Sequence, residues 1–195
     1  FYGRRIGKSL RGAQQDAMVR LLPTWRFALE EARTPAALFP HDISGLWLEI
    51  GFGGGEHLIS HAARRPDMGF IGAEPFVNGM ARMLVDLEKA GLSNIRLFGE
   101  DAALLLDRLP DASLDGTDLF YPDPWPKRRH WKRRSDVPHY VGWTLATVRN
   151  HGAFRWTAER ADDWRQPYPH WPGTRYEAKA LEEGRNPTYL TFERL

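Results

Sequence analysis

From residue 45 onward, short apolar runs alternate with longer segments in which apolar residues recur every three or four positions. The short runs predict strands at 46–50, 69–74, 95–98 and 114–121. The longer segments predict helices at 56–64, 78–91 and 102–109. Because helices separate the strands, we expect parallel pairing through right-handed crossovers. The pattern therefore predicts an α/β fold with a Rossmann-like, doubly wound, mainly parallel sheet.

The two ends of the chain interrupt this alternation. Residues 13–20 and 25–31 have helical spacing, and Pro23 separates them. Near the C-terminus, 154–157 and 189–192 read as strands without a full-length helix between them. We expect these two strands to close the sheet as an antiparallel pair.

One connection is too short for a parallel sheet. After the fourth strand, a charged loop leads directly into a helix predicted at 139–150. A parallel crossover needs about a dozen residues or more, and a fifth strand must follow it. We therefore predict a single domain over residues 1–195 with residues missing between Arg134 and Ser135. The chain begins at Phe1 rather than Met, so we also expect residues before it.

The composition and the distribution of charged residues add to this picture. The 195 residues carry a net charge of only +2, and the chain has no cysteine, which excludes disulfides and thiolate catalysis. No apolar run approaches the roughly 20 residues of a membrane helix. Bases without acids gather in an N-terminal arm, 1–12, and at 127–134. We expect RNA phosphates to meet Arg4, Arg5, Lys8, Arg11, Arg128, Arg129, Lys132, Arg133 and Arg134.

The glycine-rich sequence after the first strand predicts a nucleoside site. Gly51, Gly53 and Gly55 fall between strand and helix, where glycine lets the backbone turn and approach a ligand. Glu56 stands where a dinucleotide-binding loop has its last glycine, and its carboxylate repels a pyrophosphate. We therefore expect a nucleoside without phosphates, such as S-adenosylmethionine, rather than NAD.

Carboxylates stand near the ends of the first three strands, where ligands of open α/β sheets bind. Glu49 can hold the cationic methionine end of such a cofactor, directly or through water. Glu74 can accept both ribose hydroxyls. Asp101, just before Ala102, can accept from an adenine amino group or cap the following helix.

The loop after the fourth strand carries the candidate catalytic residue. Three prolines within 122–126 stiffen this loop, and stiffness lowers the entropic cost of positioning a base. Asp123 can accept hydrogen bonds from the N–H groups of a purine. Trp125 can stack on a base or pack in the core.

Two further motifs are less specific. His57 and His61 are four residues apart on a predicted helix, but Glu56 does not stand in the H-E-x-x-H order of a zinc protease. We expect both histidines at exposed positions and no metal site. Residues 174–177, Thr-Arg-Tyr-Glu, have the spacing of a capping box before a short helix at 178–183.

Together the motifs resemble the bacterial tRNA (guanine-N7)-methyltransferase family over nearly the whole chain. The most specific of them read YPDPWPKRRHWKRR at 121–134 and TRYE at 174–177. LEIGFGGGEH at 48–57, GAEPF at 72–76 and GEDA at 99–102 complete the resemblance. It implies a class I methyltransferase fold and methylation of guanosine N7 in the tRNA variable loop, with S-adenosylmethionine as donor. We expect a cytoplasmic enzyme, and a monomer is favoured.

The resemblance also implies residue roles. Cofactor contacts fall to Glu49, Glu74, Asp101 and Asp123, and Asp123 positions the guanine. Substrate contacts fall to Lys127, Asp136, Thr174, Arg175, Tyr176 and Glu177. Asp136 follows Ser135 where the family pattern has Thr, so this segment departs from the T-D motif.

Two alternatives remain open. One is a methyltransferase acting on an exocyclic amino group of nucleic acid, whose loop commonly reads [ND]-P-P-[YFW]; here 122–125 read Pro-Asp-Pro-Trp. The other is a non-catalytic RNA-binding module on a Rossmann-like scaffold, in which Glu74, Asp101 and Asp123 would have no evident role.

Overall fold

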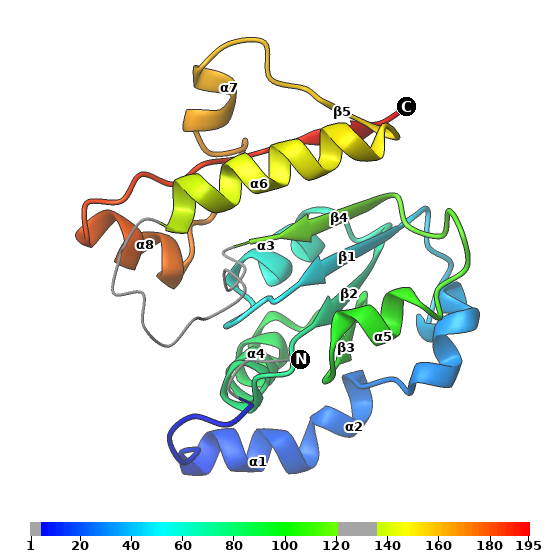
Figure 1. The fold of residues 1–195 in the computed structure, drawn as a ribbon. Coiled ribbons are helices and arrows are strands. Elements are labelled where there is room, and N and C mark those ends of the chain that lie inside the picture. Colours follow the sequence, from blue (N-terminus) through cyan, green and yellow to red (C-terminus); the bar gives the residue numbers. More distant parts are fainter. Residues whose placement is uncertain (1–4, 121–135) are drawn as a thin grey trace. The chain divides into compact units, whose positions relative to one another are not determined.

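The computed structural model describes residues 5–120 and 136–195, with side chains in the second range described from Tyr140 onward (Figure 1). The chain divides into two units, residues 1–122 and 123–195, which are treated separately below. Within the described ranges, no helix is both long and apolar enough to cross a membrane.

A parallel sheet forms the centre of the first unit (Figure 1). Its strands are β1 Leu46–Ile50, β2 Gly69–Ala73, β3 Ile95–Phe98 and β4 Gly116–Leu119. They lie in the order β3-β2-β1-β4, and every neighbouring pair is parallel. Because the order reverses beside β1, the ligand crevice of such a sheet is expected at the carboxyl ends of its strands. The expected Rossmann-like, mainly parallel sheet is confirmed.

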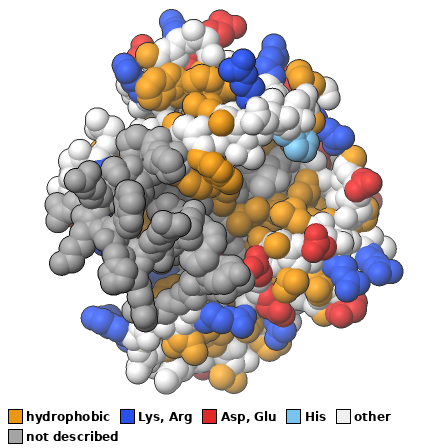
Figure 2. Space-filling model, viewed as in Figure 1, with side chains coloured by type: hydrophobic (Ala, Val, Ile, Leu, Met, Phe, Trp, Pro, Cys, Tyr) orange, Lys and Arg blue, Asp and Glu red, His pale blue; other side chains and the backbone are white. Residues whose placement is uncertain are grey.

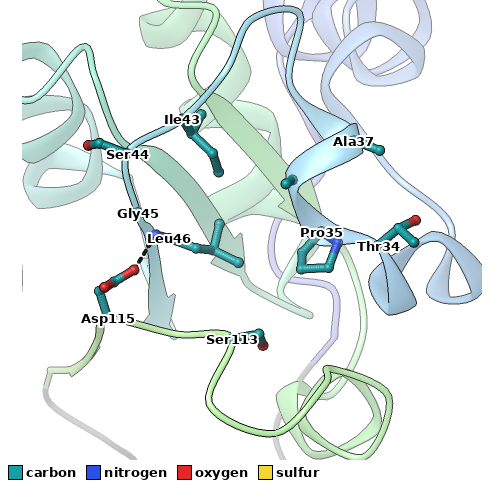
Figure 3. Close-up of a pocket in the computed structure, with 10 residues that line it drawn as sticks. Thr34, Pro35, Ala37, Ile43, Ser44, Gly45, Leu46, Ser113 and Asp115 are labelled. Atoms are coloured by element: carbon teal, nitrogen blue, oxygen red, sulfur yellow. Dashed lines mark hydrogen bonds between the residues drawn. The ribbon is translucent and has the colours of Figure 1, made fainter.

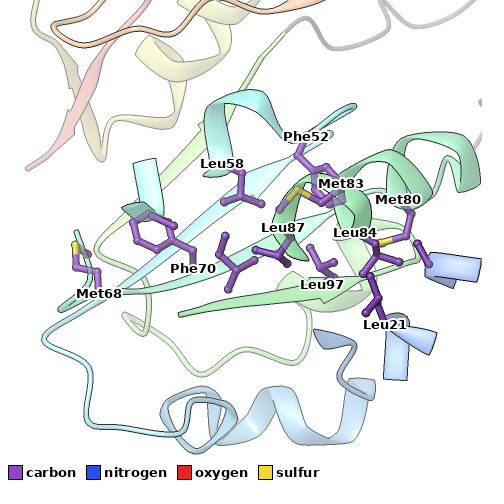
Figure 4. Close-up of a cluster of buried hydrophobic side chains, with 13 residues drawn as sticks. Leu21, Phe52, Leu58, Met68, Phe70, Met80, Met83, Leu84, Leu87 and Leu97 are labelled. Carbon is purple, nitrogen blue, oxygen red and sulfur yellow. The ribbon is translucent and has the colours of Figure 1, made fainter. Parts of the chain in front are cut away.

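Helices cover both faces of this sheet. They are α3 Glu56–Arg64, α4 Val77–Ala90 and α5 Ala102–Leu106. Successive strand residues point to opposite faces, so Phe70 packs with Leu58 and Met83 on one face (Figure 4), whereas Ile71 packs with Leu105 on the other. Burial on both faces explains why the strands read as continuous apolar runs.

The N-terminal segment corrects one prediction. Its elements are α1 Gly12–Arg20, α2 Leu22–Trp25, and the 3₁₀ helices η1 Leu29–Arg33 and η2 Pro35–Leu38. Pro23 lies in the first turn of α2, where its missing N–H costs no helical hydrogen bond. The continuous helix predicted at 25–31 is wrong, because Arg26 forms a parallel bridge with Leu97 of β3. This extended backbone places Phe27 in the core.

The second unit contains three helices and a two-stranded sheet of its own among its described residues. They are α6 Asp136–His151, β5 Phe154–Trp156, α7 Asp162–Arg165, α8 Arg175–Glu182 and β6 Phe192–Arg194. The antiparallel pairing of the C-terminal strands is confirmed. Their expected place in the parallel sheet is wrong, because β5 and β6 pair with each other, reinforced by an ion pair between Arg155 and Glu193. The second strand also begins three residues later than predicted, because Tyr189 is buried instead.

Candidate functional site

The glycine-rich loop joins β1 to α3 at the carboxyl end of the parallel sheet. Gly53 and Gly55 have φ angles of +60° and +82°, a region that side-chain-bearing residues rarely adopt. At Gly55, a Cβ atom would also collide with Sδ of Met83 in α4. The loop therefore lies against α4, and it needs glycine for both its conformation and its packing.

Gly79 of α4 also supports the glycine-rich loop, a role that the sequence did not predict. A Cβ atom at Gly79 would collide with the carbonyl oxygen of Gly53, a backbone atom that cannot rotate away. The available signal was a glycine inside an otherwise helical pattern, which usually has a packing reason. Gly79 thus allows α4 to support the loop directly.

Glu74 holds the same loop from the end of β2. Its buried carboxylate accepts a hydrogen bond from the N–H of Gly53 at Oε2 (2.8 Å) and one from the N–H of Phe76 at Oε1 (2.8 Å). Burial raises the pKa of Glu74, and these two hydrogen bonds oppose the rise. Each carboxylate oxygen has a second lone pair, so Glu74 can still accept donors from a ligand.

Glu49 forms a buried pair with His57. Its Oε2 atom lies 2.8 Å from Nδ1 of His57 in α3. Burial raises the pKa of Glu49, and the hydrogen bond from His57 opposes the rise. The expectation of exposed histidines is wrong, because the face of α3 that carries them packs on the sheet: His57 is 8% exposed, and the side chain of His61 20%.

Asp101 caps α5. Its carboxylate accepts a hydrogen bond from the N–H of Ala103 at 3.0 Å, which lowers the pKa of Asp101. Ala102 is the first residue of the helix. The capping role, one of the two roles inferred for Asp101, is confirmed, and its contact with adenine stays a prediction.

Glu56 begins α3, at the helix end that would otherwise attract a phosphate. Its Oε1 atom lies 3.4 Å from Nη2 of Arg82 in α4. The carboxylate thus puts negative charge at the positive end of the helix dipole. Arg82 offsets part of this charge, and the preference for a ligand without phosphates stays a prediction.

A cavity of about 400 Å³ opens where β2 and β3 end. Its lining includes Arg5, Glu74, Pro75, Gly99 and Glu100. The carboxylate of Glu74, which holds the glycine-rich loop, therefore lines the same cavity as Gly99 and Glu100, the two residues that follow β3.

The N-terminal arm reaches this cavity because Asn78 of α4 binds its backbone. Oδ1 of Asn78 accepts from the N–H of Gly7 (2.7 Å), and Nδ2 donates to the carbonyl oxygen of Lys8 (2.6 Å). The N–H of Val77 donates to the carbonyl oxygen of Arg5 (2.9 Å). The sequence predicted a basic arm but not its docking on the start of α4.

A larger cavity, of about 530 Å³, lies at the opposite end of the sheet (Figure 3). Its lining includes Thr34, Ser44 and Asp115, and Asp115 accepts a hydrogen bond from the N–H of Leu46 (2.8 Å). Ligands of open α/β sheets bind at the carboxyl ends of the strands. The smaller cavity is therefore the better candidate for the cofactor.

The Thr-Arg-Tyr-Glu motif begins α8 in the second unit. Oγ1 of Thr174 accepts from the N–H of Glu177 (3.1 Å), which confirms a helix start here, although α8 begins three residues before the predicted helix. The carboxylate of Glu177 is buried and accepts from Nε1 of Trp171 (2.7 Å) and from the hydroxyl of Tyr189. Glu177 therefore supports the packing of α8 rather than closing the capping box.

The remaining predicted site residues are either exposed or outside the described part of the chain. Arg175 and Tyr176 are exposed on α8. In the N-terminal arm, Arg5, Lys8 and Arg11 are also exposed. Figure 2 shows Lys and Arg side chains interspersed with Asp and Glu over the described part of one face. Outside the described residues or side chains lie Arg4, Asp123, Lys127, Arg128, Arg129, Lys132, Arg133, Arg134 and Asp136.

A parallel sheet with this strand order, a glycine-rich loop after β1 and an acid after β2 is typical of Rossmann-like proteins that bind a nucleoside. Residues 44–135 match the family model described as "Putative methyltransferase". The tRNA (guanine-N(7)-)-methyltransferase of Azorhizobium caulinodans is 56% identical, over 100% of this chain and 95% of the relative. That of Chelativorans sp. is 51% identical, with the same coverage. The chain belongs to the tRNA (guanine-N(7)-)-methyltransferase family, as its motifs predicted.

Two further findings concern length and fold. The alignment with the Azorhizobium relative extends over 218 residues, whereas this chain has 195, so the relative has residues without a counterpart here. Among solved structures, an antibiotic-related methyltransferase matches with a TM-score of 0.38 and 18% identity, over 50% of this chain and 48% of that one.

Proposed function

We propose that this chain transfers the methyl group of S-adenosylmethionine to N7 of a guanosine in the variable loop of tRNA, forming 7-methylguanosine. The observation that carries the proposal is 56% identity, over the whole chain, to a protein named tRNA (guanine-N(7)-)-methyltransferase. A tRNA substrate places the reaction in the cytoplasm.

The residues around the glycine-rich loop fit S-adenosylmethionine. Glu56 disfavours a pyrophosphate, and Glu74 offers the ribose its remaining lone pairs. Glu49, paired with His57, would hold the amino end directly or through water, and Asp101 would accept from adenine. When bound, S-adenosylmethionine supplies an electrophilic methyl group on a sulfonium.

Methylation of guanine N7 requires little acid–base chemistry from the protein. The lone pair of N7 lies in the plane of the ring and carries no proton, so no strong general base is required. The chain must mainly hold the base in line with the methyl group, because proximity and orientation supply the rate. We assign this positioning to Asp123. Further tRNA contacts are assigned to Lys127, Asp136, Thr174, Arg175, Tyr176 and Glu177.

The predicted gap between Arg134 and Ser135 is consistent with the longer alignment. In the described residues, α6 is the first element after β4, and no fifth parallel strand is present. We propose that the residues found only in the relative correspond to the missing crossover and strand of a single domain.

The test of the proposed activity is incubation of unmodified tRNA with methyl-labelled S-adenosylmethionine, followed by nucleoside analysis. We expect label in 7-methylguanosine, and chain cleavage at that nucleotide after borohydride reduction and aniline treatment. Label in N6-methyladenosine would favour the exocyclic-amino alternative. Absence of cofactor binding by isothermal titration would favour the RNA-binding module.

Replacing Gly79 by alanine is expected to weaken S-adenosylmethionine binding at least about tenfold, because the added Cβ must displace the Gly53 backbone. Alanine is otherwise the better helix former, by up to ~1 kcal/mol. The matched control is Gly142→Ala in α6, where a Cβ atom has no neighbour within 4 Å among the described atoms. Isothermal titration measures both variants, and an unchanged affinity in Gly79→Ala would contradict direct support of the loop.

Neutralising basic residues within 127–134 is expected to weaken tRNA binding and to reduce its salt dependence. Each lost phosphate contact lowers the slope of log affinity against log salt by about 0.7–0.9. The test variant replaces Arg128, Arg129 and Lys132 by glutamine, and the control replaces the exposed Arg64, Lys89 and Arg108 by glutamine, so each variant loses three positive charges. Filter binding at several salt concentrations compares them. Equal slopes would argue against a phosphate-binding segment.

A further inference from the structure

Two histidines and an aspartate gather where α3 packs on β4. One ring nitrogen from each of His57 and His61 and one carboxylate oxygen of Asp118 lie within 4.8 Å of one another. Oδ2 of Asp118 is 3.9 Å from Nδ1 of His57 and 3.6 Å from Nδ1 of His61. These distances are too long for hydrogen bonds. The shorter distance, to His61, is close to the spacing of about 3.4 Å between ligand atoms placed tetrahedrally at about 2.1 Å from a zinc ion.

The fold brings these side chains together through two regular spacings. Residues four apart on a helix share a face, so His57 and His61 both point from α3 toward the sheet. Asp118 of β4 stands beside Glu49 of β1 in the parallel register. Nε1 of Trp47 donates to Oδ2 of Asp118 at 2.7 Å and so fixes the carboxylate.

His61 has a buried ring nitrogen that forms no hydrogen bond with the other described residues. Its Nδ1 atom is inaccessible to solvent and has no hydrogen-bond partner among the described residues. The edges of Trp47 and Phe70 contact the imidazole ring, with centroids 5.2 and 4.8 Å away, and hold it in place. The packing therefore fixes a polar atom beside Asp118 without giving it a hydrogen bond.

The charge around the cluster favours a cation. Besides the two imidazoles, the charged groups that face it are the carboxylates of Glu49 and Asp118, which repel each other. The side chains of His61 and Asp118 are each about one-fifth exposed, which leaves a route for an ion and a water molecule. The site thus combines two imidazoles, negative charge and partial access to solvent.

We propose that His57, His61 and Asp118 bind a divalent transition-metal ion, of which Zn²⁺ suits the donors best. Two imidazoles and a carboxylate, with solvent in the fourth position, form a common three-ligand zinc site. Because Nδ1 of His57 already bonds Glu49, His57 would bind the ion through its other ring nitrogen, Nε2, and Glu49 would serve as the outer carboxylate that orients it. The ion has a structural role, because it joins α3 to β4 and methylation of N7 requires no metal. The sequence-based expectation of no metal rested on exposed histidines, which the structure does not show.

The test uses the full chain, stripped with a chelator and titrated with Zn²⁺ by calorimetry, and with Co²⁺ by visible absorption. We expect one high-affinity ion per chain. His61→Gln and Asp118→Asn are each expected to weaken the affinity at least tenfold. His41→Gln, at an exposed position, is the matched control and should bind as the unmodified chain does. Circular dichroism checks that all variants fold.

Two outcomes would overturn the proposal. One is the absence of stoichiometric Zn²⁺ binding by the unmodified chain, and the other is an unchanged affinity in His61→Gln.

Discussion

Replacing Asp123 by alanine is expected to lower methyl transfer to tRNA at least about a hundredfold while the chain remains folded. Guanine N7 needs no base, so the loss comes from misplacement of the purine, and a displacement of about 1 Å can cost that much in rate. Three prolines within 122–126 predict a stiff loop around Asp123, so a neighbouring acid is not expected to replace it. Label transfer under single-turnover conditions measures the effect.

The control for this variant is Asp111→Ala, at an exposed acid after α5 that also follows a proline. Its activity should equal that of the unmodified chain. Isothermal titration with S-adenosylmethionine shows whether Asp123→Ala also loses cofactor affinity, which would support a second contact by the same carboxylate. Near-normal turnover by Asp123→Ala would refute the assignment.

Replacing Glu74 by alanine is expected to weaken S-adenosylmethionine binding by about a hundredfold or more and to destabilise the fold. The N–H groups of Gly53 and Phe76 would lose their acceptor, and each buried unpaired group costs about 1–3 kcal/mol. The ribose would lose its expected acceptor at the same time. Isothermal titration and denaturant unfolding measure the two effects.

Glu74→Gln adds a pH readout, although its amide has one acceptor oxygen and can satisfy only one of the N–H groups of Gly53 and Phe76. Burial raises the pKa of Glu74 above its ordinary value of 4.5, so its protonated form stabilises the folded chain below that value. This contribution is lost as the pH rises toward the raised pKa. Glutamine does not titrate, so the unfolding free energy of Glu74→Gln should fall less over that interval. If Glu74→Ala bound S-adenosylmethionine as tightly as the unmodified chain does, this result would contradict ribose recognition by Glu74.

Much of the first unit could be predicted from local sequence alone. The strands at 46–50 and 95–98 and the helix at 56–64 have the bounds that the apolar pattern predicted. In the helix, burial follows the helical period, and in the two strands it extends over both faces, so an apolar stripe marks the helix and an apolar run marks each strand. The interrupted helix around Arg26 could not be predicted, because its bridge to Leu97 joins residues far apart in the sequence.

The candidate site divides in the same way. Glu74 and Asp101 could be predicted because the end of a parallel strand fixes their place. The role of Gly79 depends on how closely α4 approaches the loop, and the pairing of Glu49 with His57 depends on how α3 lies over β1. Such packing distances are properties of the assembled sheet and helices, so spacing along the chain does not reveal them.

The docking of the N-terminal arm also determines when the cofactor cavity can exist during synthesis. Arg5 leaves the ribosome long before Gly99 and Glu100, which line the same cavity. Asn78, which binds the arm, is likewise made long after Gly7 and Lys8. A nascent chain must therefore carry its basic arm undocked until α4 and β3 have been translated, and only then can the cavity form.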